Sequence, residues 1–347
     1  MKTLAASFVI LCVSVALIWF GLDKNKIKQT QLIQFNSESL SQNKMGEDIE
    51  RSVYVYLPPG YDTSKALYPC LYYLHGFTST HEEYKRLNFE QLMNEAIRLG
   101  LIAPCILVVP NSYTKYEGSF YTNSELNGKW ADYIAKDLVN LIDQRYRTKP
   151  QANQRGLFGH SMGGNGALKI ALQYPDVFGA VYALSPSAMD WSDEFNLNNP
   201  SFESILKAKD IGALAEDFYA RIFIAMGRVY SPDLDIQPFQ CRLPVKRNRQ
   251  IDSSVLQKWN EELVLRQYQK ALEQGTLKPA VGFDCGLEDE FKHIPVTCQK
   301  LDSLMIKHEY PHYFSTYHGN HYEQVGGIEG RIVRHALPFF DKHLRGN

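Results

Sequence analysis

The stretch RGLFGHSMGGNGALKIALQYPD, Arg155 to Asp176, decides the fold of this chain. It begins with a short apolar run, passes through a glycine-rich centre around Ser161, and continues into a helical pattern that ends near Pro175. A buried strand that turns abruptly into a helix is typical of a parallel sheet covered by helices. The stretch therefore predicts an α/β protein with Ser161 at the bend.

Strands and helices alternate on both sides of this stretch. Early strands are expected at residues 29–35 and 52–57, and the apolar runs YPCLYYLHG and APCILVVPN flank a helical segment at 82–99. Apolar residues recur every three or four positions over 130–146, which predicts an amphipathic helix. Further strands, AVYALS, AVGFDCG and YFSTYHG, follow the opening stretch. The alternation predicts a mostly parallel sheet with helices on both faces.

Residues 187–279 interrupt this alternation. The segment holds an apolar run, RIFIAM, several prolines and a helix-like stretch at 255–272, without regular spacing of strands and helices. We therefore expect one α/β domain over residues 29–347, in which 187–279 is a cap-like insertion that covers the functional site.

The N-terminus differs in character from the rest. Residues 4–22 carry no charge, Lys2 precedes them, and three lysines follow within 24–28. A basic start and an apolar stretch are typical of a signal peptide, and 19 residues are just enough to cross a bilayer. Residues 1–28 are therefore expected to be a signal peptide or a membrane anchor, and the protein to be exported (periplasmic or secreted) or membrane-anchored.

Charge and cysteine usage limit the classes of partner. The chain has 37 basic and 38 acidic residues, which are scattered, so no basic surface for nucleic acid is expected. One of the six cysteines, Cys12, lies in the apolar N-terminal segment, and the other five are scattered without a C-x-x-C pair. We expect these five to be buried apolar residues, although export would permit one or two disulfides.

The centre of the opening stretch, Gly159 to Gly163, fits the pattern G-x-S-x-G. In a nucleophile elbow, this pattern lifts a serine hydroxyl above the edge of a sheet at a tight strand-to-helix turn. The alternatives are a purely structural glycine turn and a phosphate-binding loop, but neither G-x-G-x-x-G nor G-x-x-x-x-G-K-[ST] occurs here. Ser161 is therefore the candidate nucleophile.

A serine nucleophile needs a base and a carboxylate that orients the base. In sheet enzymes of this kind the order along the chain is serine, acid, histidine, with each residue on a loop after a strand. FDCGLEDEF supplies four acidic residues, of which Asp289 is favoured because Asp284 still belongs to the strand. YHGNHYEQ supplies His318 and His321, and the turn before His321 can bring its ring over the edge of the sheet. Asp289 and His321 are the candidate acid and base.

Acyl chemistry at such a serine also needs two backbone N–H groups that bind the oxyanion. Met162 directly follows the candidate nucleophile, and Phe77 lies in the segment HGF at the end of an apolar strand. We predict that these two residues supply the donors. Tyr121, Trp130 and residues near Tyr230 could line a substrate pocket, although buried packing explains each of them as well.

One segment matches a different catalytic motif. HEYPH, His308 to His312, spells the H-E-x-x-H pattern of zinc proteases. That motif needs both histidines on one continuous helix, whereas Pro311 would break a helix and the residues after it are strand-like. We therefore expect no metal site and no cofactor.

The chain resembles the esterase D-like family of α/β hydrolases in the segments YYLHGF, GSFYTNSELNGKWADYIAKDL, GLFGHSMGGNGALKIALQYPDVFGAVYALSP, FDCGLEDEF and YHGNH. The resemblance extends from about Ser52 to Phe340. Many family members have a tryptophan shortly after the histidine, where this chain has Tyr322 and Glu323. The resemblance implies an α/β-hydrolase fold with Ser161 as nucleophile, Asp289 as acid, His321 as base, and Phe77 and Met162 as oxyanion donors.

The family includes S-formylglutathione hydrolases, feruloyl esterases, siderophore esterases and mycolyltransferases, and the motifs do not choose among them. The resemblance implies a serine carboxylesterase that cleaves a small-molecule ester or thioester through an acyl-enzyme on Ser161, and the apolar N-terminal segment predicts that this enzyme is exported. Two alternatives stay open. An acyltransferase would use the same three residues, and a catalytically silent binding protein could have the same fold.

Overall fold

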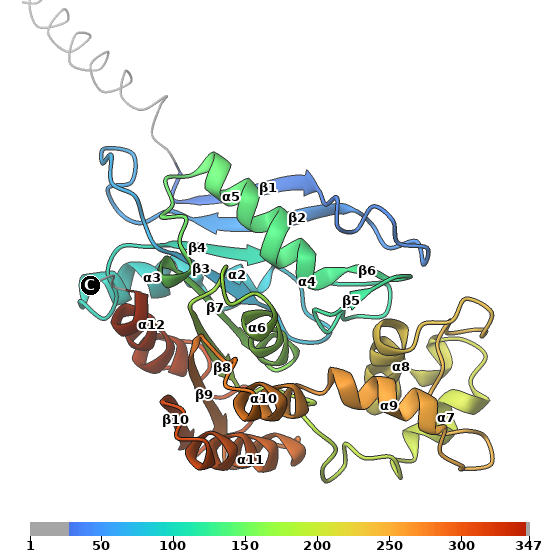
Figure 1. The fold of residues 1–347 in the computed structure, drawn as a ribbon. Coiled ribbons are helices and arrows are strands. Elements are labelled where there is room, and N and C mark those ends of the chain that lie inside the picture. The colour runs from blue at the N-terminus through green and yellow to red at the C-terminus, as the bar shows by residue number, and fades with distance from the viewer. Residues whose placement is uncertain (1–27, 345–347) are drawn as a thin grey trace, which may run out of the picture.

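The computed structural model describes residues 28–344, in which one large mixed sheet carries helices on both faces (Figure 1). Its eight strands lie in the order β1-β2-β4-β3-β7-β8-β9-β10. The pairs β1–β2 and β2–β4 are antiparallel, and all other neighbours are parallel. The strands are β1 (Thr30–Asn36), β2 (Glu50–Tyr56), β3 (Cys70–Leu74), β4 (Ile106–Pro110), β7 (Arg155–His160), β8 (Ala180–Leu184), β9 (Ala280–Gly286) and β10 (His312–Tyr317).

The central strands are apolar because both of their faces are covered. Every residue of β3, β4, β7 and β8 is buried, which explains the near-continuous apolar runs by which the sequence identifies them. The carboxyl ends of these parallel strands meet at one edge of the sheet. Loops that follow β3, β7, β8, β9 and β10 therefore gather at this edge, where ligands bind in sheets of this kind.

Two sets of helices cover the sheet, and each set shares a separate apolar core with its face. This arrangement confirms the predicted α/β architecture. One face is covered by α2 (Glu83–Arg86), α3 (Phe89–Arg98), the π-helical turn η4 (Ile332–Ala336) and α12 (Leu337–Leu344). The other is covered by α4 (Trp130–Asp132), the π-helical turn η1 (Tyr133–Leu138), α5 (Val139–Arg145), α6 (Met162–Gln173), α10 (Val264–Glu273) and α11 (His293–Lys307).

Two predicted helices are each divided in the structure. The helix expected at 82–99 breaks between α2 and α3, where Asn88 adopts the left-handed conformation with φ of 53°. The stretch at 255–272 forms two helices, α9 (Ser253–Glu262) and α10, which meet at the extended residue Leu263. By contrast, α4, η1 and α5 follow one another without a gap, as the periodicity of 130–146 predicts.

Most of the segment 187–279 lies to one side of the sheet, where α7 (Ser201–Lys207), α8 (Phe218–Tyr230) and α9 gather (Figure 1). The apolar run RIFIAM lies within α8 and is largely buried. At the end of the segment, α10 packs instead against α6 and α11 over the sheet. Short elements complete the fold: the ribbon β5 (Asn123–Ser124) and β6 (Gly128–Lys129), and the 3-10 turns η2 (Ala152–Gln154) and η3 (Gly212–Leu214).

The predicted export or anchor segment, residues 4–22, lies outside the described residues. Within residues 28–344, no helix combines the length and the apolar character that a membrane span needs. The five cysteines of this range are all free and buried, as expected for apolar core residues.

Candidate active site

Ser161 lies at the bend between β7 and α6, at the carboxyl edge of the sheet. Its φ of 59° and ψ of −119° form a strained conformation of the kind that clusters at functional sites. The Ser161 N–H donates to the carbonyl oxygen of Leu184 at 2.9 Å, which ties the bend to β8. Glycine is required beside it, because a Cβ on Gly163 would lie 1.9 Å from the Leu74 carbonyl oxygen. The residues thus form the tight strand-to-helix turn that G-x-S-x-G predicts.

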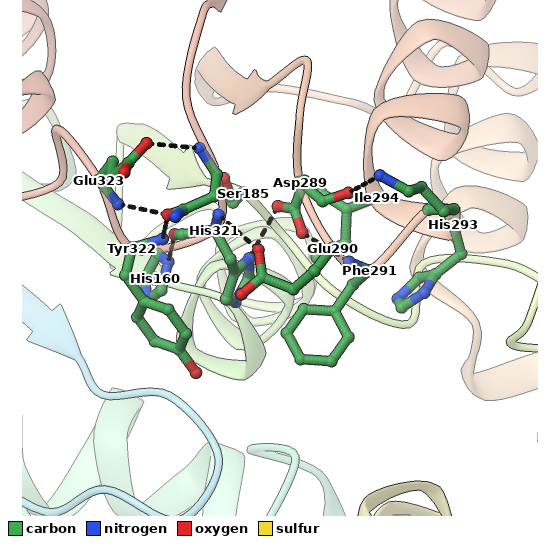
Figure 2. A network of polar contacts seen from close by, with 12 residues as sticks. His160, Ser185, Asp289, Glu290, Phe291, His293, Ile294, His321, Tyr322 and Glu323 are labelled. Atoms are coloured by element: carbon green, nitrogen blue, oxygen red, sulfur yellow. Dashed lines mark hydrogen bonds and ion pairs between the residues drawn. The ribbon is translucent and has the colours of Figure 1, made fainter.

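His321 and Asp289 form a buried pair at the same edge (Figure 2). His321 Nδ1 lies 2.8 Å from Asp289 Oδ2, and Asp289 Oδ1 accepts the Phe291 N–H at 2.9 Å, which fixes the carboxylate. The two loops are neighbours because β9 and β10 are adjacent parallel strands. A proton on Nδ1, held by the carboxylate, leaves Nε2 of His321 free to accept another proton.

The competing acid and base have other partners. Asp284 is buried within β9, where it accepts hydrogen bonds from the Tyr182 hydroxyl at 2.7 Å and from Arg331 Nε at 2.9 Å. Burial raises the pKa of Asp284 to about 6, although Arg331 acts in the opposite direction. His318 is exposed and pairs with Glu288 at 2.9 Å. Asp284 is therefore an ion-pair partner inside the fold, and His318 is a surface residue.

The two predicted oxyanion donors lie close together. Both Phe77 and Met162 contact Gly118, where an added Cβ would lie 2.6 Å from the Phe77 ring and from Met162 Sδ. Within residues 28–344, the backbone N–H groups of Phe77 and Met162 donate to no protein acceptor. Both N–H groups are therefore free to bind an oxygen atom of a ligand.

His75 holds the loop that carries Phe77. Its Nδ1 donates to the Gly76 carbonyl oxygen, and its Nε2 accepts the Ser112 N–H, each at 2.9 Å. Burial lowers the pKa of His75 to about 4, so the ring is neutral near pH 7 and Nε2 can act as an acceptor. As the first residue of the HGF segment, His75 thus gives the loop a fixed conformation.

A cavity of about 290 Å³ opens beside Ser161. One part of its wall is polar, where Arg86 Nε and Nη2 donate to the Glu83 carboxylate at 2.8 and 2.6 Å. A larger cavity of about 460 Å³ lies between α7 and residues 245–251 and contains none of the predicted site residues. The apolar part of the wall beside Ser161 includes Phe77, Phe120, Phe195, Phe218, Ile222 and Phe291.

Sequence reasoning missed most of this wall. Tyr121, Trp130 and Tyr230 are buried, and none of the three is among the described residues that line the cavity. Phe120 lines it instead. Phe120 and Tyr121 have φ of 45° and 49°, so the chain bends there, and the Tyr121 hydroxyl turns inward to donate to the His75 carbonyl oxygen at 2.9 Å.

The HEYPH segment is not a helix. His308 is at the C-cap of α11, and His312 begins β10, with its ring 2.8 Å from Asp302 Oδ1. The two histidines therefore share no helical face, as Pro311 predicts. No cluster of His, Cys, Asp and Glu side chains in the described part of the chain is arranged to hold a metal ion.

Solved structures with a similar fold include a ferulic acid esterase. Two others come from Staphylococcus aureus: an S-formylglutathione hydrolase and, third, the fluorophosphonate-binding serine hydrolase F. They are 21%, 18% and 17% identical to this chain, with TM-scores of 0.59, 0.56 and 0.56. The comparisons cover 91%, 90% and 92% of this chain and 99%, 100% and 100% of theirs. The likeness shows that the protein has the predicted α/β-hydrolase fold.

Curated proteins with similar sequences include the S-formylglutathione hydrolases of Mus musculus, 34% identical over 146 residues, and of Paracoccus denitrificans, 29% identical over 153 residues. These alignments cover 38% and 40% of this chain, and the chain spans only about half of each relative, 50% and 53%. The family model described as "Putative esterase" matches residues 43–325. Since this match covers well over half of the chain, the protein belongs to that esterase family.

Proposed function

We propose that the protein is a serine hydrolase that cleaves ester or thioester bonds. The observation that carries the proposal is the strained bend at Ser161, which opens on a cavity beside the buried pair of His321 and Asp289. The ring of His160, the residue before Ser161, packs on the ring of His321 with centroids 4.5 Å apart. Membership in the esterase family supports the same chemistry.

In the proposed reaction, Ser161 Oγ attacks the carbonyl carbon of the substrate while His321 Nε2 takes the hydroxyl proton. Asp289 keeps His321 in the required tautomer and stabilises the imidazolium ion. The oxyanion of the tetrahedral intermediate accepts hydrogen bonds from the N–H groups of Phe77 and Met162.

Collapse of this intermediate expels the alcohol or thiol, which receives the proton from His321, and leaves an acyl group on Ser161. Water then attacks the acyl-enzyme, with His321 as the base, and releases the acid and the free serine.

Labelling with a fluorophosphonate tests the proposal directly. We expect the native protein to gain one phosphonyl group on Ser161, because only a serine activated by a neighbouring base attacks phosphorus at a useful rate. Intact mass and peptide mapping would measure this. Protein denatured before labelling is the control and should stay unlabelled. Labelling at another residue, or ester hydrolysis by a protein that resists the reagent, would contradict the proposal.

The aromatic wall of the cavity supports an apolar acyl or alcohol group in the substrate. The half-buried ring of Phe218 stacks on Phe291, with centroids 5.4 Å apart. Phe218→Ala should lower kcat/KM for a p-nitrophenyl ester of an aromatic acid roughly tenfold, and that for the acetyl ester much less, because only the larger group contacts the ring. Leu206→Ala, in the other cavity, is the control and should change neither value. Equal losses on both esters would refute this assignment of the wall.

A further inference from the structure

His321 is held at three points, and only one of them is its bond to Asp289 (Figure 2). Its backbone N–H donates to Glu290 Oε2 at 3.0 Å. Its carbonyl oxygen accepts a hydrogen bond from His160 Nε2 at 2.8 Å. The ring and the peptide groups on both sides of the residue are therefore fixed separately.

We propose that Glu290 and His160 are positioning residues that clamp the backbone of His321 and thereby fix the position of its ring relative to Ser161. The inference rests on the proposed function, because it assigns a role relative to the proposed base. Proton transfer demands this precision, since the acceptor nitrogen must lie within hydrogen-bond reach of the hydroxyl. The hydrogen bond between the His321 ring and one carboxylate oxygen of Asp289 does not by itself fix the position of the His321 backbone.

His160 is suited to this role because it precedes the proposed nucleophile in the chain. Its bond to the His321 carbonyl oxygen ties the proposed base to the elbow itself, across 161 positions of sequence. A carbonyl oxygen only accepts, so Nε2 of His160 must carry a proton. Burial and, next, the nearby His321 ring keep the pKa of His160 well below its usual value, so the ring is neutral and that proton is its only one.

Glu290 follows Asp289, so a single loop holds both the ring and the backbone of His321. Burial alone would raise the pKa of Glu290, but the His321 N–H bond helps to lower it overall, and an ionised carboxylate is the stronger acceptor. Glu288 bridges the same two loops through His318 and the Gly319 N–H but makes no hydrogen bond to His321. The chain thus provides a matched control two residues away.

The test compares Glu290→Ala with Glu288→Ala, using kcat and KM for p-nitrophenyl acetate and the melting temperature. Glu290→Ala should lower kcat about tenfold with KM unchanged, because Glu290 is not among the described residues that line the cavity. Glu290→Gln, which keeps an acceptor oxygen, should recover most of the loss. Glu288→Ala should leave kcat within about twofold of the wild-type value.

His160 is tested by rescue, because it also lines the cavity. His160→Phe keeps a ring but loses the donor, and should lower kcat about tenfold, whereas His160→Gln places an amide N–H near the position of Nε2 and should restore part of it. The double variant Glu290→Ala/His160→Phe should lose less than the product of the single losses, since both changes act through His321.

Equal kcat for the Glu290→Ala and Glu288→Ala variants would overturn the clamp. So would a loss confined to KM, or glutamine variants that are as slow as Glu290→Ala and His160→Phe. If the Glu290→Ala variant unfolds, the difference in kcat between His160→Phe and His160→Gln still tests whether His160 holds the backbone of His321. A wild-type protein that neither labels at Ser161 nor hydrolyses esters would refute the proposed function instead, so the two failures are distinguishable.

Discussion

Replacing Ser161 by Ala is expected to abolish turnover of p-nitrophenyl acetate, with kcat at least about ten-thousandfold below the wild-type value. In the proposed mechanism no other group forms the acyl-enzyme. The fold should survive, because the Ser161 side chain caps no backbone group of α6 and Ala fits the positive φ no worse than Ser does. Initial rates measure the first effect, and circular dichroism with a thermal melt measures the second.

Ser187→Ala is the matched control, since Ser187 lines the same cavity. It should retain most of the activity. Undiminished turnover by the Ser161→Ala variant would refute the assignment of the nucleophile. A comparable loss in the Ser187→Ala variant would mean that the cavity is sensitive to any change and that Ser161 has no special role.

Asp289→Asn is expected to lower kcat by about ten-thousandfold while leaving KM nearly unchanged. The Asp289 carboxylate accepts the Nδ1 proton of His321, which leaves Nε2 unprotonated. An asparagine amide can donate to Nδ1 instead, and the proton then moves to Nε2, where His321 can no longer act as a base. The remaining activity should rise with pH if hydroxide replaces the base.

Asp284→Asn separates this effect from simple loss of a buried charge. Asp284 is also fully buried, but it pairs with Arg331 and Tyr182. Its replacement leaves the Arg331 charge without its carboxylate, so the melting temperature should fall. The kcat of the folded protein should stay near the wild-type value. If Asp284→Asn lowered kcat strongly and Asp289→Asn did not, the assignment of Asp289 as the acid would be wrong.

The sequence predicts the sheet and the positions of Ser161, Asp289 and His321 because each follows a strand with an apolar pattern. Parallel strands bring their carboxyl ends to one edge, so residues far apart in the chain can be placed together without knowledge of side-chain packing. Asp284 and Asp289 could be separated for the same reason, since one lies within β9 and the other lies beyond its end.

The cavity wall could not be predicted, because it depends on how irregular segments pack. Phe218 and Ile222 come from α8, whose direction relative to the sheet no local pattern fixes. Positive φ values at Phe120 and Tyr121 place Phe120, and not the predicted Tyr121, in the cavity wall. Neither residue is a glycine, so the sequence does not indicate this bend. Glu290 was one of four acidic residues in its segment, and only its bond to the His321 N–H distinguishes it.

The order of the strands has a consequence for the newly made chain. The elbow belongs to β7 and α6, whereas the residues that would activate it follow β9 and β10, which form one end of the sheet. During synthesis the serine therefore emerges long before its partners, and contacts across such separations form late and slowly. We expect Ser161 to remain inert until the final strands dock, so recovery of the proposed esterase activity during refolding would report completion of the sheet rather than its nucleation.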